Sequence, residues 1–130
     1  MKEIKAYIHN HRIADVVRAL KESELCNTDG KPGCRNLVVV PVKVLFKAMS
    51  ASEQHYSIEL AEVVVNEFKL ELVCEDQQVD ELVDIIGRGS RITQVEAGWI
   101  YVSDVISATP IRWSWTLTGS KTCKHFVPCM

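Results

Sequence analysis

The feature that most limits how this chain can fold is a strand–helix pattern that occurs twice. Residues 67–73 alternate between apolar and polar side chains, the period of a strand with one buried face. Residues 79–86 follow, with apolar side chains at the spacing of one helical stripe: Val79, Leu82, Val83 and Ile86. Residues 3–8 and 13–20 repeat this pattern. The sequence therefore predicts two copies of one strand–helix unit.

Further strands are predicted from the remaining periodic segments. The β-branched run at 37–46 is typical of a largely buried strand, and Pro41 within it indicates a bulge or an edge position because proline cannot donate a ladder hydrogen bond. Residues 98–105 alternate like a strand. Residues 55–65 favour a strand, or a short helix leading into one. Asp76 stands where the N-cap of the second helix is expected.

The order strand–helix–strand, repeated once, predicts the fold class. Two such halves form one antiparallel sheet with both helices on one face, which is an α+β ferredoxin-like βαββαβ sandwich. The opposite face would carry apolar side chains, among them Val38, Val40 and Val73. An apolar second face usually meets another subunit, so the pattern favours a homo-oligomer.

Composition and charge exclude several classes of protein. A net charge of −2 over 130 residues argues against nucleic-acid binding, and no apolar run approaches the roughly 20 residues that a membrane span needs. The first residues lack the apolar segment of a secretory signal, which predicts a cytoplasmic protein. Five cysteines, an odd number in a reducing compartment, make a structural disulfide framework unexpected. The sequence contains no nucleophile elbow, phosphate-binding loop or zinc-protease motif, so an enzyme is not predicted.

Several segments in order resemble the nitrogen regulatory protein P-II superfamily, and its divergent P-II-like members in particular. These segments are MKEIKAYI, IADVVRALKE, YSIELAE, KLELVCEDQQVDELVDII and GWIYVSDV. The resemblance covers residues 1–112, which would form the P-II-like domain, and leaves 113–130 as a C-terminal extension with cysteine and lysine. It implies nitrogen regulation and signal transduction by a homotrimer. Such trimers bind small effectors between subunits and control an enzyme, channel or transporter through a long loop.

The family's effector site maps onto this sequence only in part. Where the family has glycines and lysines that hold nucleotide phosphates, this chain retains Gly98 and has Glu96 nearby. Of the family's Arg-x-Arg, only the second position is kept, as Arg112. The resemblance and the available cations assign the effector site to Gly89, Arg91, Gly98 and Arg112. The departures favour a smaller anion than ATP in its usual mode, such as another adenine nucleotide (ADP or AMP).

The regulatory loop departs from the family as well. The family's Gly-Phe-Gly-Arg at the end of the second strand corresponds here to Val44, Leu45, Phe46 and Lys47, so the glycines that allow close backbone approach are absent. We expect Val44, Phe46 and Lys47 to begin the loop that reports effector binding. The loop has no tyrosine-bearing tip, and uridylylation is not predicted.

Cysteine and histidine residues support a competing hypothesis from another class. Cys123, His125 and Cys129 offer ligands for zinc or copper, or a reversible disulfide, while an incidental tail remains the alternative. Some P-II-like proteins carry a redox-sensitive cysteine pair in a similar extension. His9 and His11 could form a metal pair, the alternative being a solvent-facing turn. The competing function is thus a metal- or redox-responsive binding protein without nucleotide binding.

Overall fold

The structure, a computed structural model, describes residues 1–26, 33–47, 53–91 and 98–111. Its elements, in chain order, are β1 (Lys2–His9), α1 (Ile13–Glu22), β2 (Arg35–Leu45), β3 (Gln54–Ser57), β4 (Glu62–Cys74), the 3-10 helix η2 (Asp76–Gln78), α2 (Val79–Gly89) and β5 (Ile100–Asp104). Both predicted strand–helix units are therefore present, and each is followed by a further strand. The predicted extension at 113–130 lies outside the described residues.

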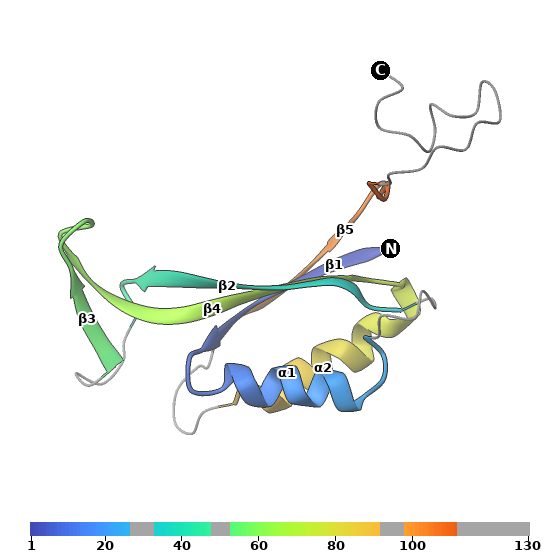
Figure 1. The fold of residues 1–130 in the computed structure, drawn as a ribbon, viewed down its shortest axis with the longest axis horizontal. Helices are drawn as coiled ribbons and strands as arrows, with labels where there is room; N and C mark the ends of the chain where they lie inside the picture. The colour runs from blue at the N-terminus through green and yellow to red at the C-terminus, as the bar shows by residue number, and fades with distance from the viewer. Residues whose placement is uncertain (27–32, 48–52, 92–97, 112–130) are drawn as a thin grey trace, which may run out of the picture.

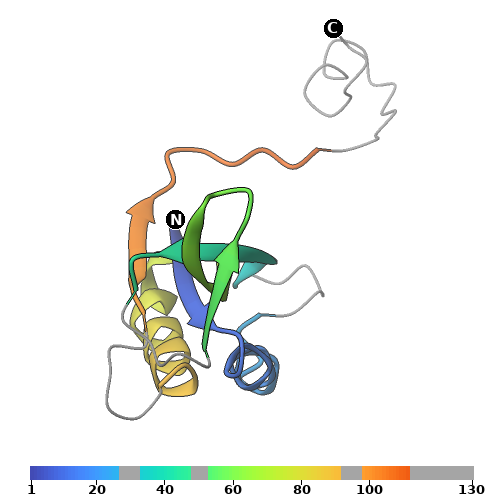
Figure 2. The same ribbon diagram turned by 90° about the vertical axis from the view of Figure 1, so that its left-hand side faces the viewer.

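One antiparallel sheet organises the molecule. Its strand order is β2-β4-β1-β5, and β3 pairs with the first residues of β4. Both helices lie on the same face of the sheet, below it in Figure 1 and side by side in Figure 2. This mixed architecture confirms the predicted antiparallel sheet covered by two helices, and its strand order is that of a ferredoxin-like fold.

The hydrophobic core lies between this sheet face and the two helices. Its fully buried side chains come from both strand–helix units: Ile4, Ile8, Val16, Leu20, Leu70, Leu72, Leu82 and Ile86. The helices approach closely at Gly89, where an added Cβ would lie 3.0 Å from Cγ2 of Val16. Since strand side chains alternate between faces, the odd-numbered residues of β1 point to the opposite, helix-free side.

We call the helix-free side the open face. The strand register places Val38, Val40 and Val73 there, beside Glu71, Lys69 and Glu3. Val38 and Val40 are 45% and 36% exposed, so the prediction of a largely buried strand at 37–46 is wrong for the single chain. The reason is that β2 is an edge strand with β4 as its neighbour. Pro41 correctly indicated the edge, but the irregular pairing lies between Arg35 and Val38.

Two local predictions are corrected by the structure. Residues 55–65 form no helix: β3 and β4 are joined by a turn at 58–61, in which the Leu60 N–H donates to the Ser57 hydroxyl. The N-cap before η2 is Glu75, which forms a reciprocal capping box with Gln78. Asp76 instead accepts a hydrogen bond from the Met1 ammonium at 2.5 Å, and this bond lowers the pKa of the Asp76 carboxyl.

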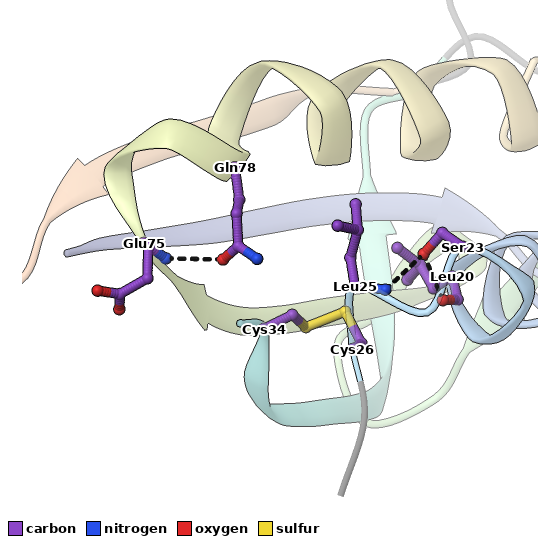
Figure 3. The surroundings of a disulfide bond; sticks show 7 residues. All are labelled: Leu20, Ser23, Leu25, Cys26, Cys34, Glu75 and Gln78. Carbon is purple, nitrogen blue, oxygen red and sulfur yellow. Dashed lines mark hydrogen bonds between the residues drawn. A yellow bond between two sulfur atoms is a disulfide. The ribbon is translucent and has the colours of Figure 1, made fainter. Parts of the chain in front are cut away.

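A disulfide joins Cys26, after α1, to Cys34, before β2 (Figure 3). The expectation that the cysteines form no structural disulfide framework is therefore wrong for this pair. The Cα atoms are 4.3 Å apart because the Cys34 N–H donates to the Leu25 carbonyl, which brings the two segments together. Cys74 is buried and free, and burial raises the pKa of its thiol, which keeps it protonated and unreactive.

Candidate functional site

A cavity of about 650 Å³ is lined by residues from the end of β2 and from the start of β5 and the segment just before it. Its walls come from segments far apart in sequence: Tyr7, Lys43, Val44, Leu45, Phe46, Lys47, Glu67, Gly98, Trp99 and Tyr101. We call it the β2–β5 cavity. It unites Gly98 of the predicted effector site with all three residues predicted to begin the regulatory loop. Its volume is within the range of small-molecule sites.

Aromatic side chains form one part of this cavity. The rings of Tyr7 and Tyr101 meet edge to face with centroids 6.2 Å apart, and Trp99 lies in the same wall. Trp99 and Tyr101 are more than half exposed, so their faces are accessible in the single chain. Such rings can stack on a planar ligand. Two further tryptophans, Trp113 and Trp115, lie outside the described residues.

Charged side chains form the other part. The Lys47 ammonium makes an ion pair with Glu67, whose side chain is almost fully buried. A buried carboxylate is costly unless it is paired, and Lys47 supplies that partner for Glu67. Lys43 lies in the same wall and is exposed. Two ammonium groups and one carboxylate thus border the cavity, an arrangement that suits a compact anion.

The backbone at the end of β2 is strained. Phe46 has φ 59°, a left-handed conformation that a bulky residue rarely adopts, and its side chain is 85% exposed. Phe46 stands where the resembling family has its second glycine, which adopts this conformation without penalty. The chain therefore keeps a backbone shape that suits glycine while placing an aromatic ring in the cavity wall. Such outliers cluster at ligand-binding sites.

Gly98 has a positional role in the same cavity. Its φ is 151°, and an added Cβ would lie 2.2 Å from the Tyr7 carbonyl oxygen. This close approach lets the Tyr7 N–H donate to the Trp99 carbonyl at 3.1 Å, which brings the segment before β5 against β1. Gly98 therefore fixes the positions of Trp99 and Tyr101 relative to Tyr7.

The other predicted site residues are not brought into the cavity. Gly89 packs against α1, and its carbonyl accepts a hydrogen bond from the Arg12 guanidinium at 3.0 Å. Arg91 is exposed just after α2 and does not line the cavity. Arg112, Cys123, His125 and Cys129 lie outside the described residues, so their predicted roles stay predictions.

Sequence reasoning missed several residues that line the cavity, and four of them carry a polar or charged group: Tyr7, Lys43, Glu67 and Tyr101. All four lie within strands that were predicted correctly, where alternation identifies a face but not its neighbours. The information needed to find them is the register of strand pairing. Tyr7 pairs with Lys69 in β4, and Lys5 pairs with Tyr101 in β5, which places both tyrosines on the open face.

Among the described residues, neither helix has the length and apolar character of a membrane span.

The antiparallel sheet, with both helices on one face (Figure 1) and the accessory strand β3 paired to β4, defines a small α+β protein of ferredoxin-like architecture. No family model matches the chain. It is nevertheless similar over 112 residues to proteins named nitrogen regulatory protein P-II. Identity is 25% with that of Porphyra purpurea and 27% with that of Rhodobacter capsulatus; each alignment covers 86% of this chain and 92% of the relative.

A further relative is nitrogen regulatory protein P-II 1 of Methanothermobacter thermautotrophicus. It is 28% identical over 112 residues, which cover 86% of this chain and 90% of the relative. These similarities confirm the resemblance drawn from the sequence. The chain is thus similar to P-II proteins over most of its length, as a divergent P-II-like sequence would be.

Proposed function

We propose that this chain is a cytoplasmic, non-enzymatic signal-transduction protein of the P-II-like type. In this proposal it binds a small anionic effector between the subunits of a homotrimer, and effector binding controls a partner enzyme, channel or transporter. The observation that carries the proposal is the β2–β5 cavity, which is lined both by Gly98 and by the end of β2 with the two residues that follow it, Phe46 and Lys47. Relatives that are regulatory by name support the functional class.

The chemistry of the cavity favours a planar ring linked to a compact anion. Trp99 and Tyr101 offer ring faces for stacking, and Lys43 and Lys47 offer donors for an anion. Glu67 offsets one of the two lysine charges. A monophosphate therefore suits the site better than a triphosphate, which needs several N–H groups and two or three cations. An adenine mononucleotide such as AMP is the proposed type of effector.

The open face supports the proposed self-association. Val38 and Val40 lie in the edge strand and are exposed, although they are β-branched and apolar. Burial against further copies of this chain would remove their apolar surface from water, at roughly 25 cal/mol per Å². Because the β2–β5 cavity is lined partly by the same edge strand, neighbouring subunits would complete its walls.

Calorimetric titration of the full chain with AMP, ADP, ATP and cyclic AMP tests the effector. We expect saturable binding that is tightest for a monophosphate. Trp99→Ala and Lys43→Ala should each weaken binding about tenfold or more, since each removes a stacking or charge-assisted contact of about 1–3 kcal/mol. Lys21→Ala, an exposed lysine on the helical side, is the matched control and should bind normally. Arg112→Ala tests the predicted contribution of that residue.

Two results would contradict the effector proposal. One is the absence of nucleotide heat with a correctly folded chain, and the other is binding that Trp99→Ala and Lys43→Ala both leave unchanged. Zinc or copper binding that is lost on Cys123→Ser, without any nucleotide binding, would instead support the competing metal- or redox-responsive function.

A further inference from the structure

A cluster of metal-ligating side chains shares no residue with the lining of the β2–β5 cavity, although one of its members, His9, pairs with Glu67 in the sheet. His9, His11 and Glu53 place one ligand atom each within 4.8 Å of the others. His9 Nε2 is 2.7 Å from Glu53 Oε2, and His11 Nδ1 is 4.0 Å from Glu53 Oε1. The two imidazole rings stand edge to face with centroids 4.7 Å apart. The sequence pointed to the two histidines, but it did not point to Glu53.

The sheet register explains why a residue 44 positions away reaches His9. Strand β1 ends with His9 opposite Glu67 of β4, and β3 begins with Gln54 opposite Val65 of the same strand. Both β1 and β3 run antiparallel to β4, so β3 continues the line of β1 along it. Glu53, just before β3, therefore meets the end of β1.

Hydrogen bonds to both ring nitrogens determine the tautomer of His9. The His11 backbone N–H donates to His9 Nδ1 at 3.1 Å, so Nδ1 must present its lone pair. In the neutral ring the proton is then on Nε2, from which it is donated to the Glu53 carboxylate. The His9 side chain is 3% exposed and Glu53 is 24% exposed, so a nearly buried imidazole and a carboxylate are held in contact.

His11 is the part of the cluster that a purely structural His9–Glu53 hydrogen bond leaves unexplained. Its side chain is 69% exposed and its Nδ1 faces Glu53 beyond hydrogen-bond distance. A rotation of this exposed ring would bring a second imidazole nitrogen to the carboxylate. Two imidazoles and one carboxylate form a recurrent set of three protein ligands for Zn²⁺, with water in the fourth position.

We propose that His9 Nε2, His11 Nδ1 and Glu53 bind a divalent transition-metal ion of the zinc class. The ion takes the place of the proton between His9 and Glu53. The displaced proton moves to Nδ1 of the same ring, so His9 remains a neutral imidazole. Once protonated, Nδ1 can no longer accept the hydrogen bond from the His11 backbone N–H, and that bond breaks. Metal binding therefore shifts the turn between β1 and α1. The bound ion also links the end of β1, through His9, to Glu53, which immediately precedes β3.

Zinc titration by calorimetry, with Co²⁺ absorbance as the spectroscopic readout, tests this site. The full chain carrying Cys123→Ser and Cys129→Ser removes the competing tail thiols. We expect one ion per chain and visible Co²⁺ bands without thiolate charge transfer. His11→Ala and Glu53→Gln should each weaken binding more than about tenfold. His55→Ala, an exposed histidine in β3, is the matched control and should bind zinc normally.

The exposed His11 makes the test independent of folding, because its replacement removes no buried group. Unchanged zinc affinity in both His11→Ala and Glu53→Gln would overturn the proposal. So would binding that disappears with the two tail cysteines, since the metal would then belong to the extension. Absence of any zinc binding by the folded chain would overturn it as well. None of these outcomes depends on nucleotide binding.

Discussion

At the scale of single residues, two backbone positions define the β2–β5 cavity. Phe46 accepts a left-handed conformation that costs about 1–3 kcal/mol, and Gly98 provides an approach that no side chain could allow. They lie on opposite segments of the same cavity. Of the two glycine positions of the resembling family, one is thus replaced by Phe46 and the other is kept as Gly98. Space decides the difference, because Phe46 projects into solvent whereas a Cβ at Gly98 would meet backbone.

Gly98→Ala is expected to destabilise the fold. The new Cβ would lie 2.2 Å from the Tyr7 carbonyl oxygen at a φ that favours glycine, so the free energy of unfolding should fall by more than about 1 kcal/mol. Gly87→Ala is the control, because its Cβ would meet only Ile100 Cδ1, at 4.0 Å. That helical substitution should stabilise by about 0.5–1 kcal/mol. Urea unfolding measures both; equal effects would refute the steric argument.

At the scale of elements, the disulfide links the end of α1 to the start of β2. Beside it the Ser23 hydroxyl donates to the Leu20 carbonyl and accepts from the Leu25 N–H, so the turn that delivers Cys26 is held locally (Figure 3). Cys34 is buried in the core cluster. The bridge therefore restrains the connection that follows the first strand–helix unit, whereas in the second unit a capping box at Glu75 and Gln78 lies between strand and helix.

Reduction of the Cys26–Cys34 disulfide should lower stability. Closing a loop between residues separated by eight positions restricts the unfolded chain, which corresponds to about 2–3 kcal/mol at 25 °C. Thermal unfolding with and without dithiothreitol measures this effect. Cys26→Ser should show the lower stability in both conditions and no longer respond to the reductant. A variant that still responds would assign the effect to other cysteines.

At the scale of the whole molecule, the two faces of the sheet differ in what covers them. The helices cover one face of the sheet (Figure 1), where the side chains of β1 and β4 are buried. The open face exposes Val38, Val40 and Tyr101. Charged side chains are interspersed there, with Lys5 and Lys69 both near Glu71. A surface with this mixture suits contact between identical copies, in which apolar and charged strips alternate.

Val40→Glu should weaken the proposed self-association. Val40 is apolar and 36% exposed on the open face, so a carboxylate there would have to be desolvated between subunits. Val17→Glu is a closely matched control, because Val17 is also 36% exposed but lies on α1. Sedimentation at micromolar concentration should show a trimer for the parent and the control, and a monomer for Val40→Glu. A monomeric parent chain would refute the homotrimer.

The sequence by itself determined the two strand–helix units, the helix-covered sheet and the resemblance to P-II proteins. These follow from local periodicity, since each element carries its own apolar stripe. Tertiary structure alone decided which distant residues came together: Gly98 and the end of β2 line one cavity, Glu53 contacts His9, and Cys26 is bonded to Cys34. Such meetings depend on strand register and chain reversal, which fix contacts between distant residues and leave no periodic signal in the sequence.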